Sequence, residues 1–166
     1  MGVKTQVRDP LVRMINGGVL AGLVGCGGFI LLAVVDRVAH RQDLWTALQR
    51  PALPLLGMTS AGAGISRLAL AVSLGCQLCL SLSWGVLFGR IFYGLSARAT
   101  VVAGMFWGVA GWLMLACVVL PLCGAPSMLH SEEWVKSLSH HLLFGAFVAV
   151  GFLPFQRPAP AMSPST

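Results

Sequence analysis

The sequence predicts an all-α protein: a polytopic membrane four-helix bundle with an interfacial amphipathic helix between its first and second spans. Three observations lead to this fold class. The chain of 166 residues is 57% hydrophobic and only 10% charged, whereas about a quarter of the residues in a soluble domain are charged. Four long stretches contain no Lys, Arg, Asp or Glu, and the connection between the first two stretches is amphipathic.

The four uncharged stretches cover residues 14–35, 68–89, 99–130 and 137–156. A helix that crosses the hydrocarbon core needs about 20 apolar residues, at a rise of about 1.5 Å each. Because Pro121 and Gly124 interrupt the third stretch, we expect that span to end near residue 123. The predicted spans are therefore 14–35, 68–89, 99–123 and 137–156, within a single membrane domain of residues 1–157.

Two segments outside the spans have a composition of their own. Between the first two spans, residues 36–50 place Val38, Gln42, Trp45 and Leu48 on neighbouring helical turns, among charged residues. This pattern predicts a short helix in the headgroup region, with Trp45 as its anchor. At the other end of the chain, the Pro- and Ser-rich residues 158–166 predict a disordered tail.

The net charge of +6 comes from basic residues scattered singly around the ends of the uncharged stretches. Such residues contact lipid headgroups and bias topology, so we expect the lipid bilayer, and no nucleic acid, as a partner. With both termini inside, the inner segments hold six basic residues and the outer segments five, which favours cytoplasmic termini. The inner set is Lys4, Arg8, Arg13, Arg90, Arg98 and Arg157, and the outer set is Arg37, Arg41, Arg50, Arg67 and Lys136.

Small residues at four-residue spacing form three Gly-x-x-x-Gly motifs on three of the predicted spans. Such motifs let helices approach closely in lipid, where the hydrophobic effect does not drive helices together. They have two interpretations, packing within the bundle and docking of another membrane subunit or a second copy. Because the motifs lie on three different helices, we expect at least one to face a partner. The helix-packing residues are Gly18, Gly22, Gly85, Gly89, Gly104 and Gly108.

The cysteines allow three interpretations. Cys76 and Cys79 share one face of the second predicted span, and a catalytic dithiol there would need a stabilised thiolate. The span supplies no positive neighbour for it, so packing is favoured over redox chemistry. Cys26 and Cys117 are predicted to lie at a similar depth, which leaves a soft-metal site as the third alternative.

His140 and His141 begin the fourth predicted span and are further candidate metal ligands. Adjacent residues point about 100° apart on a helix, so the two rings cannot both face one metal squarely. A hydrogen-bonded pair at the membrane interface is the favoured interpretation, and no cofactor is predicted.

Two resemblances to known families accompany these motifs. Cys76-Gln-Leu-Cys79 in a small four-helix membrane protein resembles the quinone-linked disulfide oxidases of the DsbB type, and vitamin K epoxide reductase also places Cys-x-x-Cys in a membrane helix. This resemblance covers only the short motif. It implies a quinone-linked membrane thiol oxidoreductase with Cys76 and Cys79 as its redox pair.

The second resemblance covers more of the chain. The segments GVAGWLMLACVVLPLCG (108–124), SHHLLFG (139–145) and GGVLAG (17–22) resemble the third, fourth and first helices of an uncharacterised family of small four-helix bacterial inner-membrane proteins. The resemblance implies a four-helix fold in the bacterial inner membrane and no particular activity.

Taken together, the sequence favours a non-catalytic subunit or assembly partner of a larger membrane complex. A quinone-linked thiol oxidoreductase and a small transporter or metal-handling protein are the alternatives.

Overall fold

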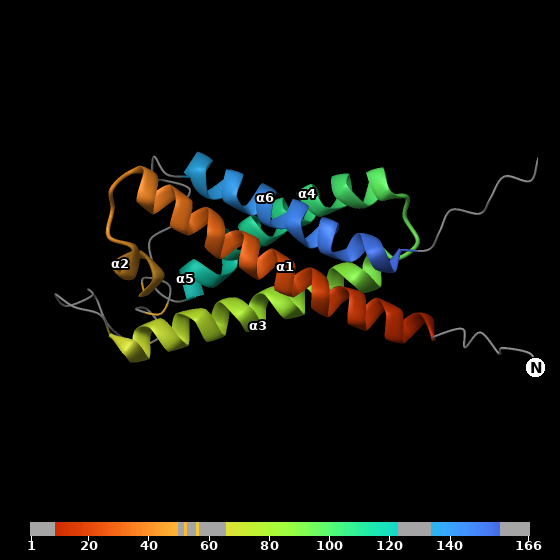
Figure 1. Cartoon of the computed structure of the whole chain (residues 1–166), viewed down its shortest axis with the longest axis horizontal. Coiled ribbons are helices and arrows are strands. Elements are labelled where there is room, and N and C mark those ends of the chain that lie inside the picture. Colours follow the sequence, from red (N-terminus) through yellow and green to blue (C-terminus); the bar gives the residue numbers. More distant parts are fainter. Residues whose placement is uncertain (1–8, 50–51, 53–55, 57–65, 123–133, 157–166) are drawn as a thin grey trace, which may run out of the picture.

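Four long helices run side by side along the long axis of the molecule (Figure 1). The computed structural model describes residues 9–49, 52, 56, 66–122 and 134–156. The long helices are α1 (Pro10–Ala39), α3 (Arg67–Ile91), α4 (Ala97–Met114) and α6 (Trp134–Phe152). The shorter α2 (Leu44–Gln49) lies between α1 and α3. A π-helical segment (Leu115–Val119) and α5 (Leu120–Leu122) extend α4, and a 3₁₀ turn (Leu153–Phe155) extends α6.

Side chains of the preceding residues determine where three of these helices begin. The carboxylate of Asp9 accepts a hydrogen bond from the Leu11 amide at 3.0 Å, and Pro10 occupies the first turn of α1. The hydroxyls of Ser66 and Ser96 accept from the amides of Ala69 and Ala99 at the starts of α3 and α4. These bonds satisfy amides that have no partner inside their own helix.

The long helices pack as two antiparallel hairpins. The first hairpin pairs α1 with α3 and the second pairs α4 with α6, and α1 also packs along α6. Figure 1 shows α1 crossing α3 near the middle of the view. Aromatic and small residues from both hairpins meet in one core, whose buried members are Ala21, Phe88, Phe144, Val148, Ala149 and Phe152.

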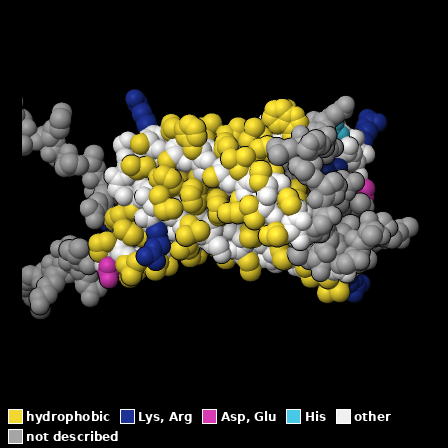
Figure 2. All heavy atoms as spheres, turned by 180° about the vertical axis from the view of Figure 1, so that it is seen from behind, with side chains coloured by type: hydrophobic (Ala, Val, Ile, Leu, Met, Phe, Trp, Pro, Cys, Tyr) yellow, Lys and Arg dark blue, Asp and Glu magenta, His cyan; other side chains and the backbone are white. Residues whose placement is uncertain are grey.

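The outer surface of the bundle is largely apolar. Figure 2 shows hydrophobic side chains over the middle of one face, with Lys and Arg towards its ends. Exposed leucines include Leu31 on α1 and Leu80 on α3. Among the described residues, four helices are long and apolar enough to cross a membrane: α1, α3, α4 with its extension to Leu122, and α6 with its 3₁₀ turn. The predicted all-α bundle of four membrane-spanning helices is confirmed.

Helix α1 (Pro10–Ala39) is longer than the predicted first span, 14–35, by four residues at each end. Residues 36–39 continue α1, so the short helix between the first two spans is only Leu44–Gln49. Asp36 contacts Lys136 of α6, which favours a continued α1 at this point. Gln49 is buried and accepts a hydrogen bond from the Ser66 amide at 2.6 Å, and this bond fixes α2 beside the start of α3. The predicted tail, 158–166, lies outside the described residues.

Candidate functional site

The two glycine pairs of the first hairpin face each other. Gly18 and Gly22 of α1 lie against Gly85 and Gly89 of α3. A Cβ atom built on Gly22 would lie 2.6 Å from the carbonyl oxygen of Ser81, and one on Gly18 would lie 2.5 Å from the Cα of Val86. Only hydrogen fits at these positions, so the two backbones are in direct contact.

The second hairpin packs in the same way. Gly104 and Gly108 of α4 face Gly145 of α6. A Cβ atom on Gly104 would lie 2.5 Å from the Cβ of Ala149, and one on Gly108 would overlap the carbonyl oxygen of His141.

All six predicted packing glycines are therefore buried inside the bundle. We expected at least one motif to face a partner, but the structure places none of the three on the outer surface. The physical reason is pairing: two motifs pack on each other, and the third packs on Gly145, which belongs to no predicted motif.

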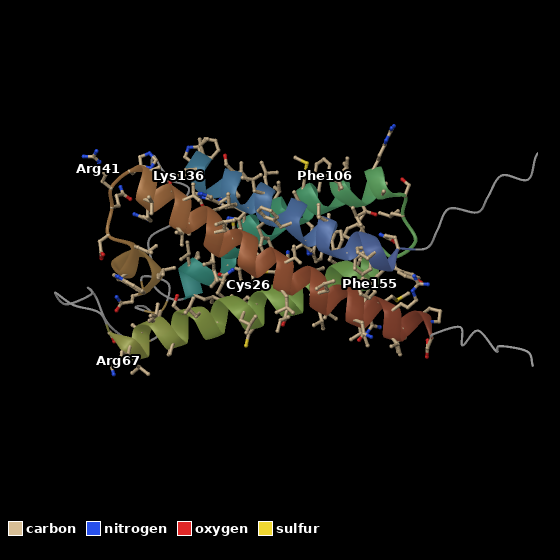
Figure 3. The ribbon with its side chains drawn as sticks, in the orientation of Figure 1. Cys26, Arg41, Arg67, Phe106, Lys136 and Phe155 are labelled. Carbon is tan, nitrogen blue, oxygen red and sulfur yellow. The ribbon has the colours of Figure 1, made fainter. Side chains whose placement is uncertain are left out.

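The cysteines do not converge. Cys26 is buried within α1, as Figure 3 locates it in the middle of the bundle. Cys76 is half-buried on α3, whereas Cys79 and Cys117 are exposed, and all four are free thiols. In the part of the chain that the structure describes, no three His, Cys, Asp or Glu side chains are grouped so as to hold a metal ion. Cys26, Cys117, His140 and His141 are thus not assembled into a site there.

Both histidines contact one aromatic ring of α1. Phe29 meets His141 edge to face at 5.4 Å between ring centroids, and His140 at 6.4 Å. His141 Nδ1 lies 2.8 Å from the Ser137 carbonyl oxygen. Because a carbonyl oxygen only accepts, Nδ1 carries the proton, and Nε2 is the acceptor of a neutral ring. The side chains pack and hydrogen-bond locally, on the face of α6 next to α1.

An ion pair joins the end of α1 to the start of α6. Lys136 Nζ lies 2.7 Å from a carboxylate oxygen of Asp36, and His40 Nδ1 lies 3.3 Å from the other. Figure 3 shows Lys136, Arg41 and Arg67 at this same end of the bundle. The pair connects the two hairpins where the apolar surface gives way to charged residues.

Two tryptophans connect α3 and α4, and the sequence interpretation missed them. Trp84 and Trp107 stack with ring centroids 4.5 Å apart. The indole N–H of Trp84 donates to the Trp107 carbonyl at 3.3 Å, and that of Trp107 donates to the Trp84 carbonyl at 3.1 Å. Each tryptophan directly precedes a motif glycine, Gly85 or Gly108, and that adjacency was the available signal.

Buried polar groups in the described bundle are few and uncharged. The buried polar residues are Gln49, Ser73, Ser81 and Thr100. The Thr100 hydroxyl donates to the Ser96 carbonyl and accepts from Gln156. The buried indole N–H of Trp112 has no hydrogen-bond partner. The interior that the structure describes thus presents no row of ionisable side chains along the bundle.

The outward face of α3 carries small residues at four-residue spacing. This outer stripe consists of Ala71, Gly75, Cys79 and Ser83, all of which are exposed. A Cβ atom built on Gly75 would meet nothing within 4 Å. The outer stripe combines the spacing of a close-packing motif with a surface that no other part of the described bundle covers.

These features define the class of the protein: it is a multi-pass integral membrane protein, in whose described residues four helices are long and apolar enough to span the bilayer. No protein-family model, curated protein or solved structure matches the chain.

Proposed function

We propose that this protein is a non-catalytic subunit or assembly partner of a larger membrane complex, which it joins through the outer stripe of α3. The observation that carries the proposal is the exposure of four small residues, one per helical turn, on a helix that is long and apolar enough to span a membrane. In lipid, helices associate through close van der Waals contact and interhelical hydrogen bonds. Small side chains permit the contact, and the hydroxyl of Ser83 can supply a hydrogen bond.

The interior of the bundle supports a docking role for the outer surface rather than a transport pathway through the bundle. Ion and proton pathways in membrane proteins are lined by ionisable side chains. No charged side chain is buried in the described bundle. Backbone contacts at the glycine interfaces fill the space between the helices within each hairpin.

The thiols support the same proposal. Cys79 is part of the outer stripe, where a small apolar side chain is suited to helix contact. No ion pair or hydrogen bond in the described structure joins a cation to Cys76 or Cys79. A stabilised thiolate would need such a neighbour, so the quinone-linked oxidoreductase is the weaker alternative.

The proposal also covers the membrane in which the protein lies and the side that its termini face. The start of α1 and the end of α6 lie at one end of the bundle (Figure 1), where Gln156 also contacts the α3–α4 connection. We propose that this end is cytoplasmic, on the basis of the basic-residue bias. We also propose the bacterial inner membrane and membership of the uncharacterised four-helix family, on the basis of the sequence resemblance.

A Gly75→Leu variant tests the proposal. The new side chain would project from the outer stripe into open space, so the bundle should still insert while a partner helix is displaced. The measurement is purification in mild detergent, followed by identification of the membrane proteins that co-purify. We expect these to be lost from the Gly75→Leu preparation.

Gly27→Leu is the matched control. Gly27 on α1 also has nothing within 4 Å of a built Cβ, but its neighbours one turn away, Leu23 and Leu31, are large and exposed. This variant should keep every partner that the unmodified protein has. Equal behaviour of the two variants would show that the outer stripe is not the docking surface. Oxidative cross-linking through Cys79 distinguishes the two kinds of partner, because a disulfide-linked homodimer identifies a second copy of this chain and a mixed disulfide identifies a different subunit.

A further inference from the structure

The glycine spacing of α1 recurs in α4. Gly18, Gly22 and Gly25 follow one another at four and three residues, and Gly104, Gly108 and Gly111 do the same. The two helices run in the same direction along the bundle. An offset of 86 residues therefore superposes the packing face of α1 on that of α4.

The partner helices α3 and α6 match at an offset of 60 residues. Gly85 then corresponds to Gly145, and the contacts correspond as well. Gly85 approaches the carbonyl oxygen of Gly18, as Gly145 approaches that of Gly104. Likewise, Gly22 abuts the carbonyl oxygen of Ser81 as Gly108 abuts that of His141, and Ser81 and His141 are also 60 residues apart. The two hairpins are thus repeats of one packing unit.

The repeat makes two of the contacts between the hairpins equivalent: α1 with α6, and α3 with α4. The helices α3 and α6 also meet, where the rings of Phe88 and Phe152 lie 5.8 Å apart between centroids. The α1/α6 interface is closed by small residues. A Cβ atom on Gly25 would lie 3.0 Å from the Phe144 ring, and one on Gly151 would lie 3.0 Å from the Cα of Ala21. The helices consequently pack closely along their length.

At the α3/α4 interface, the corresponding residues are larger. Trp107 replaces Ala21, Trp84 replaces Phe144, and Ile91 replaces Gly151, while Gly111 alone stays small. The backbones of α3 and α4 accordingly lie further apart than those of the other neighbouring pairs. The stacked and reciprocally hydrogen-bonded tryptophan pair, Trp84 with Trp107, bridges this wider interface.

One end of the α3/α4 interface is held separately. Gln156, at the end of α6, accepts a hydrogen bond from the Gly94 amide at 2.7 Å. It donates to the Phe92 carbonyl at 3.0 Å and to the Thr100 hydroxyl at 2.8 Å. The bonds to Gly94 and Phe92 fix the α3–α4 connection to the end of α6, and the bond to Thr100 joins α4 to α6 within the second hairpin. Any separation of α3 and α4 is therefore expected towards the opposite end.

We propose that the two hairpins are rigid repeats that pivot about the α1/α6 interface and the Gln156 contacts, and that the tryptophan pair holds the α3/α4 interface closed. Opening separates the start of α3 from the end of α4, where the π-helical segment begins. The glycine interfaces within each hairpin stay intact, because their backbones are already in contact.

Distances between paired nitroxide spin labels test this mechanism. Labels on exposed Leu78 of α3 and Leu113 of α4 report on the α3/α4 interface, and labels on Leu113 and Leu143 of α6 report on one hairpin. Both pairs are built on a background in which the five cysteines are replaced by alanine. A Trp107→Leu substitution should shift the Leu78–Leu113 distances to longer values and leave the Leu113–Leu143 distances unchanged.

Trp107→Phe provides a second variant, which keeps a ring and removes the N–H donor. It should shift the Leu78–Leu113 distances in the same direction by a smaller amount. It also replaces Trp107→Leu in the test if that variant does not fold. An unchanged Leu78–Leu113 distance in the folded variants would overturn the proposal. So would equal broadening of both distances, because the bundle would then be loosening as a whole rather than opening at one interface.

Discussion

The two faces of α3 carry similar small residues in opposite surroundings. On the inner face, Gly85 is buried against the backbone of α1, and Gly89 would place a Cβ atom 2.7 Å from the Met14 carbonyl oxygen. On the outer face, Gly75 would place one in open space. Both faces repeat every four residues, so the spacing alone does not say which of them the bundle uses for its own packing.

This difference shows that small residues at four-residue spacing form a close helix contact only where the neighbouring helix also has small residues facing them. Gly85 meets Gly18 and Gly22, whose missing side chains leave room for a second backbone. No described helix offers such a surface to Gly75. Larger side chains should therefore destabilise the isolated protein at the inner face and not at the outer face.

The largest effect is expected for Gly85→Leu. The new side chain would overlap the α1 backbone, which cannot move without separating the first hairpin. We expect a loss of about 3 kcal/mol or more in the free energy of unfolding, at the upper end of overpacking effects. Unfolding in mixed detergent micelles, followed by circular dichroism, measures it. Gly75→Leu should show no loss, because its side chain meets nothing within 4 Å of the Cβ position; a comparable loss in that variant would contradict the contrast between the faces.

Replacing glycine by alanine should change the free energy of unfolding in opposite directions at the two faces. In Gly89→Ala, the methyl group would crowd the Met14 carbonyl and the Phe152 ring, at a cost of about 1–3 kcal/mol. In Gly75→Ala, the methyl group meets nothing, and the better helix former should add up to about 1 kcal/mol. The same unfolding titration checks both variants. Changes of equal sign would mean that helix propensity, rather than packing, controls both positions.

The smallest effect is expected for the double variant Cys76→Ala and Cys79→Ala. Cys79 is exposed and Cys76 is half-buried, and substitutions near the surface, away from special contacts, change stability by about 0.5 kcal/mol or less. Folding and cellular function should be nearly intact, because we interpret both thiols as packing groups. Complementation of a deletion strain measures function. Loss of function, or a mixed disulfide trapped at either residue, would instead favour the thiol oxidoreductase.

The spans were predictable from the sequence because the absence of charge over about 20 residues is a strong local signal. The direction in which each glycine motif points was not predictable in the same way. It depends on helix pairing, and Gly145 shows why: it has no glycine partner four residues away in sequence, yet it completes the α4/α6 interface. Likewise, Trp84 and Trp107 lie 23 residues apart on separate helices, so only the fold could reveal their mutual hydrogen bonds.

The stacked indoles also give the molecule an optical signature. Two aromatic chromophores with ring centroids 4.5 Å apart and planes inclined by 26° interact electronically. Such an interaction splits their ultraviolet transitions into bands of opposite sign in circular dichroism. The amplitude of that couplet falls steeply as the rings separate. The unlabelled protein in native lipid therefore offers a spectroscopic measure of the contact between α3 and α4.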